Sequence, residues 1–463
     1  MSWASTELEK TDLGDARRKR RLVKIIEDLS AQPNVSLQQA CRDNAALQGL
    51  YDFWSNPRIG SSQIISGHVQ STIERCKQES VVLAIQDTTE LDFKNHKHKS
   101  GLGHLSNPNA KGLKVHTTLC VSSLGVPLGL IDKQVWAREK KTRRTSAQLR
   151  REPIQNKESN CWLKGLKATN DLIPEDLQVV TIADREADIF ELFAQPRRNG
   201  SEFLIRACRR RSVKKDSEEI EKLQEAITNV PVQGTHKIKL QRTPRRKPRP
   251  CTLTLRWTSL ELQPPVYHPN RRELEPMVVN VLLAQEENPP PREKPVKWLL
   301  LTTLPVTNLD QAVQCLEWYS ARWLIERYHY TLKSGCRLEQ LQLEQAHRIE
   351  KALATYAIVA WRLLWLTYQA RVKPEETVEN VLETIEWEIL YRYHHQKNPT
   401  PEDIPTISEC VVWIAKLGGF LGRKSDGNPG VKTLWRGLTK LDGMVMGWQL
   451  YEQMKSSGSS VML

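Results

Sequence analysis

The chain has 463 residues, a formal net charge of +14 at pH 7 and a sequence pI near 9.3. Its length leaves room for about three domains, and its excess of Lys and Arg predicts a polyanionic partner, nucleic acid before membrane. The first residues contain no apolar signal segment and no apolar run approaches about 18 residues, so secretion and membrane spanning are disfavoured and a cytoplasmic location is expected. Nine cysteines without a C-x₂-C pair favour neither a zinc site nor disulfides.

Residues 1–70 are predicted to be helical. One helical stretch of this region carries five adjacent cations, Arg17, Arg18, Lys19, Arg20 and Arg21. Like charges at neighbouring positions repel one another unless a polyanion neutralises them, so phosphate contact is favoured over a solvated helix face. Among the smaller basic groups, 209–211 and 245–247 suit contacts to a DNA backbone, whereas 140–144 is ambiguous because it lies at the tip of a strand-to-helix connection.

The next segment is expected to form a mixed sheet. Its predicted order is strand 81–86, strand 113–122, strand 126–136, helix 145–168, strand 177–183, helix 186–195 and strand 202–210. Three consecutive strands followed by a helix and a further strand are typical of a ribonuclease-H-like sheet. In that fold the first and fourth strands end side by side, which would bring Asp87 and Asp184 together across 97 residues.

Two aspartates follow buried apolar runs, Asp87 in VVLAIQDTTELDF (81–93) and Asp184 in LQVVTIADREADIF (177–190). The carboxyl end of a buried parallel strand is where α/β sheets place their chemistry. For Asp184 the alternative is a helix N-cap, since a helix start follows it. Both aspartates are therefore candidate site residues.

A proline-rich segment separates Asp184 from Glu326, 142 residues later. Twelve of the 25 prolines fall between Pro231 and Pro295, so this segment is not helical. Residues 235–240 and 251–262 alternate with period two, and 277–286 is a third apolar run. The pattern predicts an antiparallel β-subdomain inserted into the core, which resumes near 297.

The segment YSARWLIERYHYTLK (319–333) is predicted to be one amphipathic helix. Tyr319, Arg322, Glu326 and Lys333 would fall within about 60° of one another at about 100° per residue. This face could grip a metal-bound phosphate; a solvated, salt-bridged face is the alternative. Asp87, Asp184 and Glu326 together would make an oxygen-ligand set suited to two Mg²⁺ or Mn²⁺ ions.

DREAD at 184–188, DTT at 87–89 and the Y-x₂-R-x₃-E-x₆-K spacing resemble the DDE transposases of the insertion-sequence-four type, the group that contains the transposon-five transposase. The segments 13–25, 297–306 and 415–437 extend the resemblance along most of the chain. It implies an α/β fold with a ribonuclease-H-like catalytic core (71–212 and 296–371) interrupted by a β-rich insertion (213–295). Helical N-terminal DNA-binding (1–70) and C-terminal dimerisation (372–463) domains would flank the core.

The resemblance also implies an activity and its partners. The chain would be a metal-dependent cut-and-paste transposase that binds double-stranded DNA, both transposon inverted-repeat ends and target DNA, as a homodimer in a synaptic complex. Its setting would be a prokaryotic cytoplasm, with nucleoid association when bound to DNA. Asp87, Asp184 and Glu326 would hold two Mg²⁺ ions, for which Mn²⁺ substitutes.

The DNA contacts implied by the resemblance are more dispersed. Tyr319, Arg322 and Lys333 would grip phosphates, and Trp298 would stack on a base flipped out during hairpin formation. Core packing is the alternative for Trp298, and it is the favoured interpretation for Trp323. The remaining contacts would come from Arg17, Arg18, Arg21 and Arg206, together with Arg210 from the basic group after the last core strand.

Three other functions are compatible with parts of this pattern. A structure-specific nuclease on the same fold would cut DNA without strand transfer. A non-cutting, transposase-derived protein would bind ends only, although an intact acidic set argues against it. A tyrosine recombinase or topoisomerase would use Tyr319 covalently.

Overall fold

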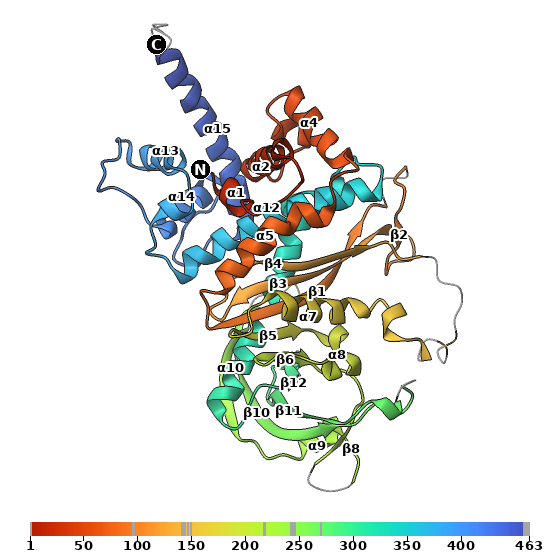
Figure 1. Ribbon diagram of the computed structural model, residues 1–463. Helices are drawn as coiled ribbons and strands as arrows, with labels where there is room; N and C mark the ends of the chain where they lie inside the picture. Colours follow the sequence, from red (N-terminus) through yellow and green to blue (C-terminus); the bar gives the residue numbers. More distant parts are fainter. Residues whose placement is uncertain are drawn as a thin grey trace.

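The computed structural model describes residues 2–94, 98–139, 145, 148, 151–215, 219–240, 247–268 and 271–456. Helices from both ends of the chain gather at one end of the molecule, and the β-rich part lies at the other (Figure 1). A twelve-stranded sheet in the order β2-β3-β1-β5-β6-β12-β11-β10-β7-β8 forms the body, with β4 beside β3 and β9 beside β10.

The N-terminal region is helical, as predicted, and its last helix extends beyond residue 70. Local sequence explains where the helices start: Asp15 accepts a hydrogen bond from the Arg17 backbone amide at 2.8 Å, and Ser36 forms a capping box with Gln39. The basic helix buries its apolar side, including Leu22 and Ile26. The elements are α1 (Trp3–Glu7), α2 (Ala16–Ala31), α3 (Leu37–Ala40), α4 (Asn44–Ser55) and α5 (Ser61–Cys76).

The core sheet confirms the ribonuclease-H-like topology. β1 pairs antiparallel with β3 and parallel with β5, and β5 pairs parallel with β6. Leu83 and Ile85 of β1 join one core cluster, whereas Val82 and Ala84 join another. A strand covered on both faces needs a continuous apolar run, which is what the sequence supplies. The strands are β1 (Val81–Asp92), β2 (Gly103–His104), β3 (Lys111–Ser122), β4 (Pro127–Trp136), β5 (Gln178–Ala183) and β6 (Ser201–Arg206).

Several predicted boundaries in this region are wrong. The helix expected at 145–168 is α7 (Asn160–Leu172), preceded by the short turn η1 (Ile154–Asn156). The helix expected at 186–195 divides into the 3₁₀ turn η2 (Arg185–Ala187) and α8 (Phe190–Ala194). β6 stops at Arg206 instead of 210. The Ala207 amide still donates to Leu299 of the neighbouring strand at 2.8 Å, but the amides of Cys208 and Arg209 bond to the side chain of Asp188 instead.

The insertion is antiparallel, as predicted, but it is continuous with the core sheet. β10 pairs with both β9 and β11, β11 pairs with β12, and β12 pairs with β6 of the core. Its elements are β7 (Ser212–Lys214), β8 (Glu221–Lys222), α9 (Leu223–Thr228), β9 (Gly234–Leu240), β10 (Arg249–Leu262), η3 (Arg271–Glu273), β11 (Met277–Glu286) and β12 (Lys297–Thr302).

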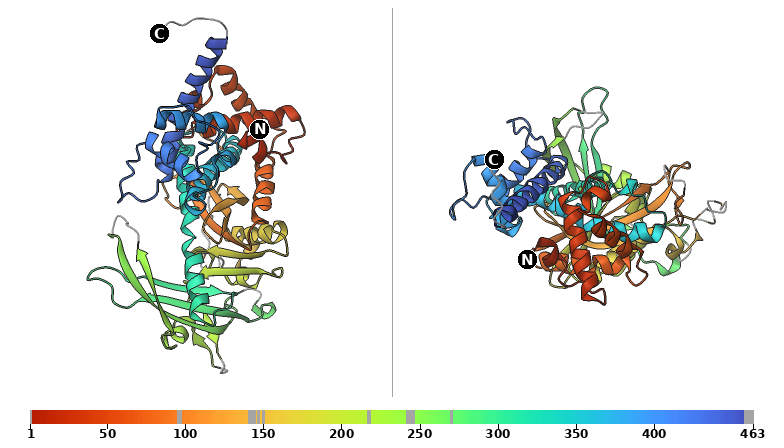
Figure 2. Two further views of the ribbon diagram at one scale, coloured as in Figure 1. Left: turned by 90° about the vertical axis from the view of Figure 1, so that its left-hand side faces the viewer. Right: turned by 90° about the horizontal axis from the view of Figure 1, so that it is seen from above.

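The rest of the chain is helical. α10 and α11 form a column between the β-rich end and the helical end, and α12 passes through the centre with buried side chains on all sides (Figure 2). The elements are α10 (Leu309–Ser320), α11 (Trp323–Tyr330), the π-helix η4 (Thr331–Gly335), η5 (Leu338–Gln340), α12 (Ala346–Val372), η6 (Val378–Asn380), α13 (Thr384–His395), α14 (Ile407–Leu417) and α15 (Val431–Ser456). Within the described ranges, no helix combines the length and the apolar character needed to cross a membrane.

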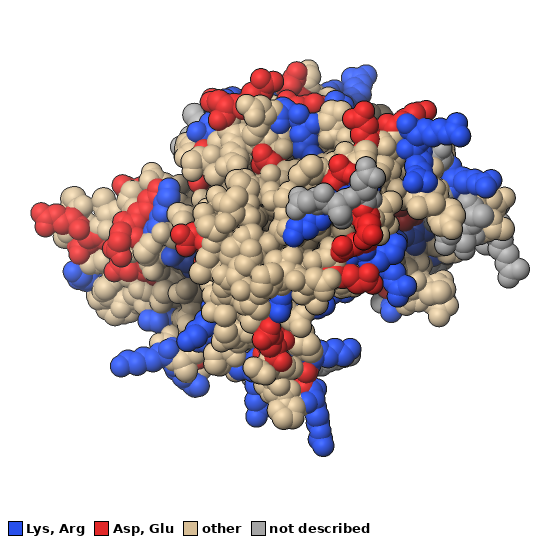
Figure 3. All heavy atoms as spheres, turned by 90° about the horizontal axis from the view of Figure 1, so that it is seen from below, with Lys and Arg blue, Asp and Glu red and all other residues tan. Residues whose placement is uncertain are grey.

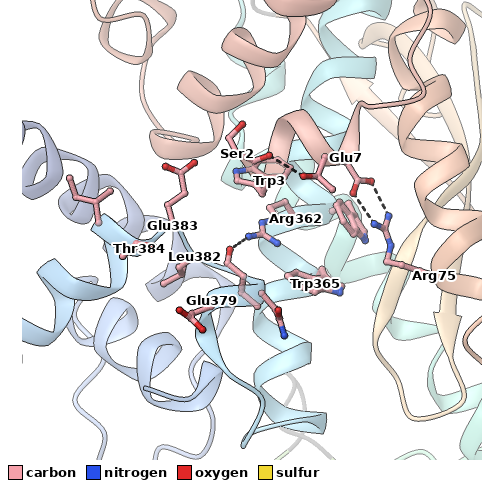
Figure 4. Close-up of a pocket in the computed structure, with 15 residues that line it drawn as sticks. Ser2, Trp3, Glu7, Arg75, Arg362, Trp365, Glu379, Leu382, Glu383 and Thr384 are labelled. Atoms are coloured by element: carbon pink, nitrogen blue, oxygen red, sulfur yellow. Dashed lines mark hydrogen bonds and ion pairs between the residues drawn. The ribbon is translucent and has the colours of Figure 1, made fainter. Parts of the chain in front are cut away.

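The first and last parts of the chain meet around a cavity of about 690 Å³. On its N-terminal side, Arg75 forms an ion pair with the buried Glu7 at 2.8 Å. Arg362 of α12 lies over the rings of Trp3 and Trp365, at 4.9 and 4.7 Å, and donates to the carbonyl of Val381 (Figure 4). The ion pair therefore joins α1 to α5, and the cation–π contact of Arg362 with Trp3 anchors α1 onto α12.

Candidate active site

The sheet register places Asp87 and Asp184 at the same level. The parallel ladder between β1 and β5 ends at the pair Ile85 and Ile182, and each aspartate lies two residues further along. β1 itself continues to Asp92 against β3, so the prediction that Asp87 ends its strand is wrong. Asp87 lies at the edge of the parallel pairing because the partner strand stops there.

Asp184 follows β5 directly and caps the turn η2. Its Oδ1 accepts a hydrogen bond from the backbone amide of Glu186 at 2.8 Å, so the alternative N-cap interpretation is also correct. A carboxylate has about four acceptor positions, and one capping bond leaves room for further partners. Capping fixes the direction in which Asp184 points from the sheet edge.

Arg322 connects Asp87 to Glu326. Its guanidinium pairs with the Glu326 carboxylate, and its Nη1 lies 3.8 Å from Asp87 Oδ2. Burial, with the nearby charges of Asp184 and Glu326, raises the pKa of Asp87 to about 7, although Arg322 and a hydrogen bond from the Thr88 amide act in the opposite direction. The three predicted acids are thus electrostatic neighbours, drawn from β1, the end of β5 and α11.

The donor atoms of these three acids suit a divalent metal ion. Three carboxylates provide the hard oxygen ligands that Mg²⁺ and Mn²⁺ prefer, and a buried carboxylate with a raised pKa is one that a cation would stabilise in its charged form. As the side chains lie, no three His, Cys, Asp or Glu residues in the described part of the chain are grouped closely enough to hold an ion. Arg322 supplies the positive charge between Asp87 and Glu326 instead.

The prediction of one continuous helix over 319–333 is wrong. α10 ends at Ser320, a turn spans 321–322, α11 covers Trp323–Tyr330, and the last residues form a π-helix. The four polar residues therefore do not line one straight face. Tyr319 is 5% exposed, whereas the Glu326 side chain is 56% exposed.

Aromatic and basic side chains surround Tyr319. The ring of Trp298 meets it edge-on at 5.7 Å between centroids, and Trp298 is itself half-buried. Burial raises the pKa of the phenol, and the charges of Arg322 and Arg206 act against that rise. Arg206, at the end of β6, also donates to the carbonyl of Lys297 at 2.8 Å. Three predicted DNA contacts, Arg206, Trp298 and Tyr319, thus come together.

Lys333 and Trp323 lie apart from that cluster. Lys333 donates to the carbonyl of Glu90 at 2.7 Å, pairs with Glu339 at 3.3 Å and borders a cavity of about 590 Å³. Trp323 is 41% exposed and touches Tyr368 edge-on at 6.3 Å. This partial packing leaves both interpretations of Trp323 open.

The predicted N-terminal contacts lie along α2. Arg17 is exposed and pairs with Asp15 at 3.1 Å, Arg18 donates to the carbonyl of Leu13 at 2.9 Å, and Arg21 is exposed beside Gly49. Elsewhere Arg210 is exposed beyond β6. The basic residues 140–144 and 245–246 lie outside the described residues.

The face seen in Figure 3 carries charges of both signs. Groups of basic side chains alternate there with acidic ones instead of forming one patch (Figure 3). Asp188, whose buried carboxylate organises the basic segment after β6, was not among the predicted site residues. Its position as the last acid of DREAD, four residues after Asp184, was the signal in the sequence.

Three family models match the chain. A transposase DNA-binding model matches residues 1–59, a transposase DDE domain model matches 162–362, and the transposase Tn5 dimerisation domain model matches 358–458. Together they make up a Tn5-like architecture. This chain is a Tn5-like DDE transposase. It accordingly has a DNA-binding region over α1 to α4, forms homodimers through its C-terminal helices, and belongs to enzymes that use divalent metal ions.

The matched ranges bear unequally on the site. Asp184 and Glu326 lie inside the DDE match, and the basic helix α2 lies inside the DNA-binding match. Asp87 lies outside all three matches, so its place in the site depends on the sheet register and on its contact with Arg322.

Proposed function

We propose that this transposase performs cut-and-paste transposition, binding the inverted-repeat ends of its element as a homodimeric synaptic complex and joining them to target DNA. The observation that carries this proposal is the convergence of Asp87, Asp184 and Glu326, through the β1–β5 register and Arg322, at one edge of the sheet. The division into domains at 1–70, 71–212 with 296–371, 213–295 and 372–463 is part of the proposal.

The acids would hold the metal ions. Asp87 would bind both of two Mg²⁺ ions, with Asp184 completing one site and Glu326 the other; Mn²⁺ would substitute. When bound, the ions would supply activation of the attacking oxygen and charge stabilisation at the leaving oxygen. Arg322 would then be available to phosphate, because its two present carboxylate partners would have other ligands.

Cleavage and joining would use a single site in sequence. Water attacks the phosphorus at the transposon end, a P–O bond forms and the P–O3′ bond breaks, which frees a 3′-hydroxyl. That hydroxyl attacks the opposite strand, forming a hairpin and releasing flanking DNA; a second water opens the hairpin before strand transfer. Tyr319, Arg322 and Lys333 would bind the phosphates, and Trp298 would stack on the displaced base.

A covalent role for Tyr319 is disfavoured. Its side chain is 5% exposed, and burial raises the pKa of its phenol, which makes the nucleophilic phenolate harder to form. We therefore assign it to positioning. Trapping of a protein–DNA adduct after denaturation would contradict this assignment.

The test is incubation of the purified chain with DNA that carries the ends of its own element, Mg²⁺ and a target plasmid. The proposal expects nicks at the transposon ends, then hairpins, then joined products. Nicks without joining would support the structure-specific nuclease instead, and binding without nicks would support the non-cutting alternative. A random-sequence duplex of equal length serves as the control DNA.

A further inference from the structure

Asp188, the last residue of DREAD, is a buried acid whose bonds all lead to one basic segment. Its side chain is fully buried. It accepts hydrogen bonds from the backbone amides of Cys208 and Arg209, each at 2.6 Å, and from Arg211 Nε at 2.6 Å. A second nitrogen of Arg211 also pairs with it. One carboxylate thus satisfies donors from three residues about 20 positions further along the chain.

These bonds fix the backbone from which the arginines project. Arg211 turns inward, is 7% exposed and lies 4.8 Å from the ring centre of Phe193. Arg209 and Arg210 are exposed. With Arg211 and the amides of 208 and 209 held from within, the side chains of Arg209 and Arg210 extend from a backbone that is ordered before DNA binds. Ordering the backbone in advance lowers the entropy cost of binding.

The arginines are presented beside the candidate active site. Cys208 Sγ donates to the carbonyl of Arg185 at 3.3 Å, so the segment rests on the turn that follows Asp184. Arg209 and Arg210 line a cavity of about 550 Å³, whose other lining residues include Lys157 and Lys222. Three acids also line the cavity, but Asp188 pairs with Arg211 and Glu191 pairs with His268. The remaining four cations outnumber the remaining acid, Glu186, and this excess of positive charge suits a chain of phosphates.

We infer that Asp188 is a positioning residue that presents Arg209 and Arg210 to backbone phosphates of the DNA strand entering the active site. This inference rests on the proposed function for the identity of the DNA. Arg210 was predicted from the sequence to contact DNA. The structure adds Arg209, the cavity that both arginines line, and Asp188, which holds the backbone of their segment. Guanidinium groups suit this role because their fork of donors matches phosphate oxygens.

The test compares Asp188→Asn with the surface variant Arg209→Ala/Arg210→Ala and with the two combined. The readout is the slope of log Kd against log salt for binding to end DNA. Each phosphate contact contributes about 0.9 to that slope, so the arginine variant should lower it by about 1.8, and Asp188→Asn should lower it in the same direction. The combined variant should show no further loss, because Asp188 acts through these arginines.

Glu286→Gln is the matched control. Glu286 is a buried acid on the insertion strands and pairs with Arg249 at 2.6 Å. Glu286→Gln therefore removes a buried, paired charge, as Asp188→Asn does, but neither Glu286 nor Arg249 lines the cavity. Its salt slope should equal the wild-type value. If Asp188→Asn does not melt cooperatively, Asp188→Glu takes its place. The longer side chain displaces the acceptor atoms by one methylene, so this variant should also lower the salt slope.

An unchanged slope in the folded Asp188 variant, or a further fall in the combined variant, would overturn the inference. Failure of the proposed function looks different. In that case the wild-type chain would not nick end DNA. The salt slopes of the Asp188 and arginine variants could still be compared on the same duplex, because DNA binding can be measured without cleavage.

Discussion

At the scale of single residues, Arg322 lies between two of the three acids proposed for catalysis. It pairs with Glu326 and approaches Asp87 to 3.8 Å, yet burial and neighbouring acids still raise the pKa of Asp87 to about 7. The acidic group is therefore under-neutralised. In the proposed function, divalent cations bound by these acids would remove repulsion that Arg322 alone does not balance.

Trp298→Ala tests the proposed stacking role. If the half-buried indole serves a flipped base, nicking should survive and hairpin formation on a pre-nicked substrate should fall by about 5- to 150-fold, since stacking is worth about 1–3 kcal/mol per base. Trp298→Phe keeps an aromatic ring and should recover part of the loss. If Trp298 only packs against Tyr319, truncation should cost about 3–5 kcal/mol of stability and depress both steps equally.

At the scale of elements, α2 combines a buried apolar side with an exposed basic side. Arg17→Ala/Arg21→Ala should weaken binding to end DNA and lower the slope of log Kd against log salt by about 1.8, for two lost phosphate contacts. Lys10→Ala/Lys77→Ala removes two surface cations that already pair with Glu74 and should leave the slope unchanged. Equal slopes for both double variants would mean that α2 faces solvent.

Glycine sets the approach of α14 to α15. A Cβ at Gly437 would lie 1.8 Å from the carbonyl oxygen of Ile414, so Gly437→Ala should separate the helices and cost about 1–3 kcal/mol in a denaturant melt. Gly443, on the same helix, has open space around it. Gly443→Ala should instead stabilise the chain by up to about 1 kcal/mol. Similar effects of both substitutions would contradict the close packing.

Elements with strong periodicity could be predicted from sequence, and their junctions could not. The apolar run around Val82–Ile85 identified β1 because both of its faces are buried. The break between α10 and α11 escaped prediction, because neither residue of the turn, Ala321 or Arg322, is a glycine or proline, and both keep right-handed helical backbone angles. Asp188 escaped too, because its partners begin 20 residues later and only the fold brings them together.

At the scale of the whole molecule, the insertion and the core form one sheet, and the two chain ends share one helical region. Asp442 of α15 accepts hydrogen bonds from Gln32 at 2.9 Å and Arg42 at 3.1 Å, so the DNA-binding and dimerisation regions touch directly. The acids proposed for catalysis lie on separate elements of the core. DNA binding and cleavage should therefore be separable by mutation.

The most direct test of that claim measures nicking and end binding side by side in Asp87→Ala, Asp184→Ala and Glu326→Ala. Loss of even an outer-shell partner of a metal ligand costs about 10–100-fold, so each variant should lose at least about 100-fold in Mg²⁺-dependent nicking while its Kd for end DNA stays close to wild type. Glu317→Gln, an exposed acid on α10, is the control and should nick normally. Wild-type nicking by any one of the three variants would remove that residue from the site and contradict the account.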